Sequence, residues 1–214
     1  KVNISSDVLG TVSSTMGMGV AGALGYTDVV SDINHSGNNT INVSDSSITA
    51  TEQISTASED ALQIKAGNSV VIDNKAVPVS AQAVSMGRTV VKGNDAVAVN
   101  VNLGNANNTN ANNSFVAKGT TVSAQNTPQV KNYIPANVNL GFVTGHGTIV
   151  ESSFGGSVGV SVTDSNSFTT QDLAITGQVG ELIDHNQVEE NRKYTSYADN
   201  LAVNVAVEDI SVNK

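Results

Sequence analysis

Apolar and polar residues alternate along most of this chain, and this alternation is the feature that most constrains its fold. From Val2 to Val20 most even positions are apolar, whereas the odd positions are almost all polar or small. The same pattern returns at residues 77–83, 97–103, 134–142, 158–162 and 201–207. Side chains of a strand point alternately to its two faces, so a period of two residues predicts strands with one buried face. We therefore predict an all-β protein.

Clusters of turn-forming residues lie between these runs. Asn, Gly, Asp and Ser tolerate tight turns, and they gather at residues 35–39, 67–68, 73–74, 93–95 and 164–166. We expect an antiparallel β-sandwich, of the jelly-roll or pilin-like kind, with a long N-terminal strand extension. Residues 1–22 would form this extension and residues 23–214 a single β-rich domain. A β-solenoid is the alternative, although no repeat of about 20 to 50 residues is evident.

Several segments depart from the alternating pattern. Residues 58–66 and 186–194 carry the capping residues and charges of short helices, and both are predicted to be helical. The unusual length of the N-terminal run predicts a bend or bulge near Gly10, and a phase change in the apolar pattern predicts a β-bulge around residues 208–209. Residues 100–113 are rich in Asn and fit either a solvated loop or a stacked strand edge with Asn ladders.

Composition excludes several classes of function. The chain has 10 basic and 19 acidic residues, a net charge of −9, and no Cys. It therefore lacks the basic surface that nucleic acids require, and thiol chemistry, disulfides and cysteine-bound zinc are excluded. No apolar run is long enough for a membrane-spanning helix. The histidines, predicted to lie in exposed loops, show no metal-site spacing; they are His35, His146 and His185.

Two short motifs resemble enzyme signatures. Residues 17–22 match the G-x-G-x-x-G pattern of dinucleotide sites, but no helical pattern follows them. We interpret them as small residues against which another backbone packs closely. Ser157 lies in a G-x-S-x-G sequence, and Asp172 or Asp184 and then His185 follow in the order of a hydrolase triad. Ser157 is, however, followed by apolar residues at strand spacing. We expect no enzyme activity, no cofactor and no catalytic or metal-binding residues.

The composition of the chain resembles that of a class of bacterial surface proteins. About one residue in eight is Asn, only 14% of residues are charged, and the chain contains phrases such as Leu-Ala-Val-Asn-Val-Ala-Val at residues 201–207. These features are similar to bacterial extracellular fibre and adhesin proteins, that is, pilin-like and functional-amyloid-like subunits. The resemblance implies a secreted, fibre-forming protein of the cell surface. No Met precedes Lys1, so we expect a processed terminus.

The N-terminal run is the candidate interface between subunits. A long apolar strand at the chain end is an aggregation hazard unless it is paired, and addition to a neighbouring sheet pairs it. We expect the chain to be the structural subunit of an extracellular filament, a homopolymer formed by strand addition. The alternative is a monomeric adhesin domain that binds a carbohydrate or a host surface. The predicted donor-strand residues are Val2, Ile4, Val8, Val12, Met16, Met18 and Val20.

Overall fold

Every regular element in the described part of the chain is a β-strand. The computed structural model describes residues 1–50, 62–104, 112–134, 138–163, 166–180, 195–198, 202–207 and 211–213. The strands are β1 Val2–Val43, β2 Ser47–Thr49, β3 Leu62–Leu103, β4 Asn113–Val116, β5 Gly119–Asn126, β6 Gln129–Tyr133, β7 Val138–Leu140, β8 Val143–Phe154, β9 Ser157–Val162, β10 Asn166–Thr169, β11 Asp172–Val179, β12 Thr195–Ala198, β13 Ala202–Val207 and β14 Ser211–Asn213. No helix that could cross a membrane occurs in these residues. The prediction of an all-β protein is confirmed.

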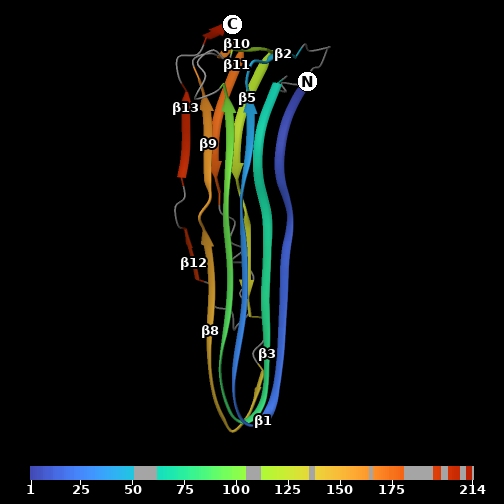
Figure 1. The fold of residues 1–214 in the computed structure, drawn as a ribbon, viewed down its shortest axis with the longest axis vertical. Helices are drawn as coiled ribbons and strands as arrows, with labels where there is room; N and C mark the ends of the chain where they lie inside the picture. The colour runs from blue at the N-terminus through green and yellow to red at the C-terminus, as the bar shows by residue number, and fades with distance from the viewer. Residues whose placement is uncertain are drawn as a thin grey trace.

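The strands are arranged as a stack of long, narrow rungs. Within one rung the chain runs out along the molecule, reverses at the far end and returns (Figure 1). The described residues form four rungs: β1 and β2, β3 and β4, β5 to β10, and β11 to β14. β1 pairs with β3 over its whole length, from Val2 with Leu62 to Val43 with Leu103. Equivalent residues of the first two rungs are therefore 60 residues apart, as are the hydrogen-bonded Asn42 and Asn102.

All strand pairs in the described residues are parallel, so the prediction of an antiparallel sandwich is wrong. The two halves of a rung face each other through their side chains, and each half forms its backbone hydrogen bonds with neighbouring rungs. Parallel and antiparallel strands have the same two-residue alternation, so that pattern could not distinguish them. Successive rungs stacked in parallel are what a solenoid requires. Register partners are 60 residues apart between β1 and β3 and 53 apart between β5 and β11, which is longer than a repeat of about 20 to 50 residues.

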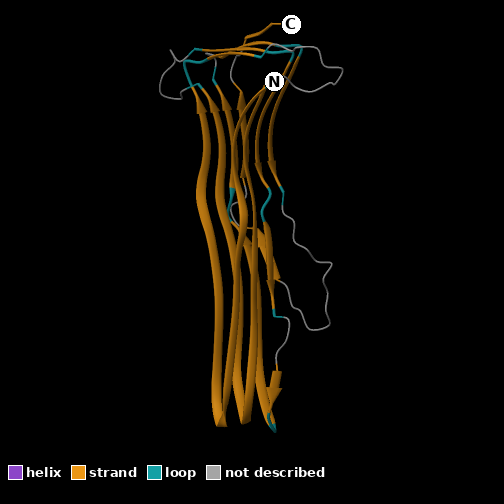
Figure 2. Ribbon diagram, turned by 90° about the vertical axis from the view of Figure 1, so that its right-hand side faces the viewer, coloured by secondary structure: helices purple, strands orange, loops and turns teal. Residues whose placement is uncertain are grey.

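A short second sheet closes one end of the rungs. It consists of β2, β4, β10 and β14, and it lies across the end of the long strands, near the N-terminus (Figure 2). Each of these strands carries a Ser at the same register position, and these residues are Ser47, Ser114, Ser167 and Ser211. We call this sheet the closing sheet. It contributes the stacked rings of Phe115 and Phe168, whose centroids are 5.0 Å apart.

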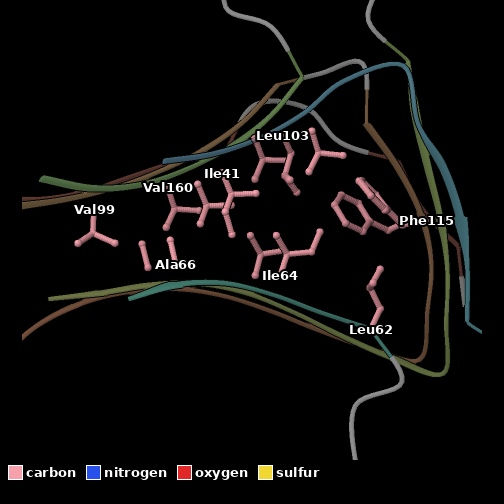
Figure 3. Close-up of a cluster of buried hydrophobic side chains, with 14 of the residues drawn as sticks. Ile41, Leu62, Ile64, Ala66, Val99, Leu103, Phe115 and Val160 are labelled. Atoms are coloured by element: carbon pink, nitrogen blue, oxygen red, sulfur yellow. The ribbon is translucent and has the colours of Figure 1, made fainter. Parts of the chain in front are cut away.

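The main hydrophobic core lies between the two halves of the rungs, next to the closing sheet. Figure 3 shows Ile41, Leu103 and Val160 facing Ile64 and Ala66 across this space, with Phe115 at its end. Leu62, Ile64 and Phe115 are completely buried. Two smaller clusters lie further along the rungs. Their members are Val29, Ala76, Val91, Ile134 and Val150 in one, and Ile33, Val70, Ile72 and Val130 in the other.

The structure changes several local predictions. Residues 62–66, predicted as the end of a helix, belong to β3, and residues 58–61 and 186–194 lie outside the described residues. The predicted turns at residues 35–39, 67–68, 73–74 and 93–95 lie inside β1 and β3. The bulge predicted at residues 208–209 is also outside the described residues. β1 includes Gly10, which has φ 154°, and extends past residue 22. The bend expected near Gly10 and the domain boundary expected at residue 22 stay predictions.

Candidate functional site

The first rung leaves one edge of the stack open. β1 pairs with β3 along one side, and no other described strand pairs with β1. Its outer edge therefore presents unpaired backbone groups over a strand of 42 residues. Such an edge is a template for pairing with another chain. This makes the outer edge of β1 the strongest candidate for an interaction site.

The last rung forms the opposite end of the stack. β11 pairs with β5, β12 with β8 and β13 with β9, and no described strand lies beyond them. Within the described residues, the stack thus ends in a strand edge on both sides, and residues of the two ends occupy equivalent register positions. A surface on one end that complements the other can join copies head to tail.

Apolar side chains of the core reach both ends. At the β1 end, Val2 and Ile4 are half-buried and pack against the main core, as does Ile48 of β2. At the other end, Leu173, Ile175 and Val179 of β11 are half-buried against the same core. Their equivalents inside the stack, such as Leu62 and Val122, are fully buried. The core is therefore incompletely covered at each end.

The predicted donor-strand residues all lie on β1, but they differ in burial. Val2, Ile4, Val8 and Val20 are half-buried, and Val8 packs against the cluster around Ile33. The others are exposed, namely Val12 at 40%, Met16 at 37% and Met18 at 41%. All seven residues lie on β1, which pairs with β3 of the same chain. Their contact with a neighbouring subunit stays a prediction.

Buried asparagines bridge the two halves of a rung at repeating positions. Asn74 donates from Nδ2 to the backbone oxygen of Lys92 at 2.7 Å. Asn132, its register partner on the next rung, donates to the backbone oxygen of Glu151, also at 2.7 Å. Lys92 and Glu151 are themselves register partners. Because the same bond recurs from rung to rung, slipping one rung along its neighbour would leave buried polar groups unpaired.

A second set of asparagines ties the rungs to the closing sheet. Asn113 donates to the backbone oxygen of Val43 at 2.9 Å, and Asn166 donates to that of Leu103 at 3.0 Å. Asn113 also donates to Oδ1 of Asn166 at 2.8 Å. The Asn-ladder alternative for residues 100–113 therefore holds at Asn113 and at Asn102. Residues 105–111 lie outside the described residues.

A buried carboxylate joins the first two rungs. Asp95 is 1% exposed and accepts a hydrogen bond from Nδ2 of Asn68 at 3.2 Å. Nδ1 of His35, its register partner on β1, lies 2.7 Å from Oδ2 of Asp95. Asn68 also donates to Oδ1 of Asn126 on the third rung at 2.8 Å. His35 was predicted in an exposed loop, whereas it lies in β1 and pairs across rungs. This pairing helps to hold β1 in register.

Opposite charges occupy neighbouring rungs at the surface. Arg88 lies in register with Asp28, and its Nη2 is 2.7 Å from Oδ2 of Asp28. This hydrogen bond, together with the attraction of the carboxylate, raises the pKa of Arg88. Nζ of Lys92 lies 2.7 Å from Oε2 of Glu151, its partner on the next rung. If the same charged residue recurred in successive rungs, like charges would lie side by side and repel each other. In these two pairs the neighbouring rungs carry opposite charges instead.

The far end of the rungs is uncharged and apolar. We define the tip as residues 16–27, 76–87 and 138–149, where the rungs reverse; it contains no Asp, Glu, Lys or Arg. Phe142 is 97% exposed and Leu24 is 75% exposed. The other exposed large apolar residues of the tip are Met16, Met18, Tyr26, Val79, Met86, Leu140, Val143 and Ile149. In a chain of net charge −9, this apolar end is a second surface suited to contact.

His146 at the tip makes stability depend on pH. Its Nε2 lies 2.7 Å from Oγ1 of Thr89, and burial lowers the pKa of His146 below 6.5. The unfolded chain therefore binds a proton more readily than the folded chain, and the folded state loses stability as the pH falls through about 6.5. We expect the midpoint of urea unfolding to fall modestly between pH 7.5 and 5.5. The variant His146→Gln should show a smaller fall, and an equal fall in both proteins would contradict this assignment.

The enzyme-like motifs are parts of strands. Ser157 is the first residue of β9 and does not lie at a strand-to-helix turn. The residues that follow it are buried at alternate positions, namely Val158, Val160 and Val162. Asp184 and His185 lie outside the described residues. Gly17 and Gly19 lie in β1, and an added Cβ would meet nothing within 4 Å at either position. The expectation of close backbone packing there is therefore wrong. No group of three metal-ligating side chains occurs among the described residues.

The buried asparagines were missed in the sequence, although a signal was present. Asn68 and Asn126, like Asn74 and Asn132, are 58 residues apart, and Ser-Phe occurs at residues 114–115 and again at 167–168. Asn was assigned to turns because its side chain competes for backbone hydrogen bonds. Inside the stack the same property satisfies backbone groups of the opposite half-rung.

Comparison with protein-family models, curated proteins and solved structures finds no match to this chain.

Proposed function

We propose that this chain is the structural subunit of an extracellular filament that grows by β-strand addition between neighbouring copies. The observation that carries this proposal is the outer edge of β1, a strand of 42 residues along which no described strand other than β3 pairs. An edge of this length exposes many backbone donors and acceptors, and a second chain can satisfy them. The sequence resemblance to fibre-forming surface proteins supports the same function.

β1 has few of the features that block pairing at an edge. Natural sheets protect their edges with prolines, charged residues or bulges. β1 contains no Pro, and its only acidic or basic residues besides His35 are Asp7, Asp28 and Asp32. Asp28 already forms an ion pair with Arg88. The strand is therefore suited to accept a partner.

The geometry of the stack determines what kind of assembly this pairing gives. The first and last rungs lie at opposite ends of the stack and run in the same direction, so one copy can follow another without changing the register. Such a head-to-tail contact does not close on itself and produces a filament. Polar ladders and apolar columns would then continue through many copies, as in cross-β fibres.

The test is direct observation of assembly. We expect electron micrographs of the purified chain to show unbranched filaments, and aligned filaments to diffract at about 4.7–4.8 Å along their axis, which is the spacing between hydrogen-bonded strands. Light scattering should show a mass that rises with concentration. A chain that remains monomeric at every concentration would contradict the filament function.

A second candidate function is a monomeric adhesin domain that binds a carbohydrate or a host surface. The exposed, uncharged tip favours it, because Tyr26 and Phe142 offer aromatic faces to a ligand there. This function requires a stable monomer. The light-scattering experiment therefore distinguishes the two candidates.

A further inference from the structure

The register of the rungs assigns the contact between copies: we infer that β1 of one copy pairs with the last rung of the next in the register that relates successive rungs. Val2, Ile4 and Val8 of one copy would then lie over Leu173, Ile175 and Val179 of its neighbour. The partner is a second copy of this chain. This inference rests on the proposed filament function and specifies its interface.

The pairing follows from columns of equivalent residues. One column runs through Val2, Leu62, Thr120 and Leu173, one residue from each rung. A second column runs through Ile4, Ile64, Val122 and Ile175 in the same way. If the next copy continues the stack, the last residue of each column lies next to the first residue of the same column in that copy. Apolar residues then meet apolar residues at both positions.

The third column gives the strongest argument, because its two ends resemble each other and differ from its interior. It runs through Val8, Asn68, Asn126 and Val179. The two interior asparagines are hydrogen-bonded to each other, and the ladder stops at a valine on either side. A valine side chain cannot form the hydrogen bonds of the Asn ladder, but the two valines can make an apolar contact with each other. The terminal rungs are thus matched to one another rather than to the interior.

Burial of the end residues supports the same contact. Val2, Ile4, Leu173, Ile175 and Val179 pack against the main core but remain partly exposed. Their interior equivalents Leu62, Ile64 and Val122 are fully buried. Docking of a second copy would bury the end residues as fully as the interior residues are already buried. Removal of apolar surface from water favours this association.

The closing sheet continues in the same register. Ile48 of β2 pairs with Phe115, Phe115 with Phe168, and Phe168 with Val212 of β14. Ile41 heads a column that reaches Val205 of β13 through Val101 and Val160. A second copy placed by the first three columns therefore brings apolar positions together in the return half-rung and in the closing sheet as well.

Disulfide trapping tests this register, because the chain contains no Cys. Ser5 and Thr176 are exposed and belong to one column, through Lys65 and Ser123. Within one copy they are three rung spacings, about 14 Å, apart, which is too far for a disulfide. Across the proposed junction they would be about 4.8 Å apart, which permits one.

We expect the double variant Ser5→Cys/Thr176→Cys, oxidised after assembly, to give a ladder of covalent multimers on a non-reducing denaturing gel. The control Ser5→Cys/Ala174→Cys is two residues out of register, about 8 Å apart across the junction, and should give no ladder. Filaments without a ladder from the first pair, or with a stronger ladder from the control, would overturn the register but leave the filament function standing. Absence of filaments from the unmodified chain would overturn both.

Discussion

Replacing Ile4 with Asp should prevent filament formation while leaving the chain folded. Ile4 is half-buried in the single chain, so a carboxylate there still reaches water. In the proposed junction the same position lies over Ile175 of a neighbour, where an unpaired charge is strongly unfavourable. We expect the critical concentration for assembly, measured by sedimentation, to rise at least about a hundredfold, which corresponds to about 2.7 kcal/mol.

The matched control is Ser5→Asp, which adds the same charge one residue along the strand. Ser5 is exposed on the opposite face of β1 and lies in register with Lys65. This variant should assemble at nearly the concentration of the unmodified chain. Circular dichroism and thermal unfolding would establish that both variants are folded. Equal assembly of the two variants would show that the inner face of β1 is not the contact.

A complementary variant at the other end makes the experiment directional. Ile175→Asp should also prevent assembly, whereas the exposed neighbour Thr176→Asp should not. Each blocked variant keeps one intact end, so a mixture of Ile4→Asp and Ile175→Asp should form dimers that cannot grow. Light scattering would measure this dimer mass. Filaments in the mixture, or monomers alone, would contradict head-to-tail addition.

Replacing Asn113 with Ala should cause the largest loss of stability from a polar side chain. Asn113 is buried and makes three hydrogen bonds: it donates to Val43 and Asn166, and it accepts one from the backbone of Ser46 at 3.0 Å. These bonds join the first three rungs at the closing sheet. Their loss removes the hydrogen-bond partner of the Ser46 backbone N–H and that of Oδ1 of the buried Asn166, and we expect a cost of about 2–4 kcal/mol in the free energy of unfolding.

Asn112 provides the control for this measurement, because it is the adjacent Asn and is exposed. Asn112→Ala should change the free energy of unfolding by less than about 0.5 kcal/mol. Urea unfolding below the concentration at which filaments form would give both values. If the two substitutions were equally mild, the buried ladder would not stabilise the stack in the way proposed here.

The strands themselves could be predicted from the sequence in several places. The alternation at Val97, Val99, Val101 and Leu103 identified a strand, and the structure buries all four side chains in the core. Residues 158–162 behave in the same way in β9. These predictions succeed because alternation reports directly on which side chains leave water, whatever strand lies alongside.

The tip shows where this reasoning fails. Val77, Val79, Ala81 and Ala83 share one face of a strand, but that face points outward, with Val79 37% exposed. The opposite face, which carries Ser80 and Gln82, is the buried one. Inside the narrow tip these polar groups find partners, as Ser80 does with Ser85 at 2.6 Å. Polarity alone therefore misassigns a face where buried hydrogen bonds replace apolar contacts.

The candidate interface was predictable only in part. The apolar N-terminal strand was visible in the sequence, and so was its suitability for pairing with another chain. Its counterpart on β11 was not, because Leu173, Ile175 and Val179 become significant only once the register places them in the columns of Val2, Ile4 and Val8.

The sequence by itself therefore determined that the chain forms strands, because side-chain alternation is a local property of the extended backbone. It did not determine the direction of pairing or the partner of each strand. Parallel and antiparallel sheets require the same alternation, and the contacts that select between them join residues about 60 positions apart. Only the tertiary structure could decide this, since buried asparagines and matched columns stabilise one register when whole rungs are stacked together.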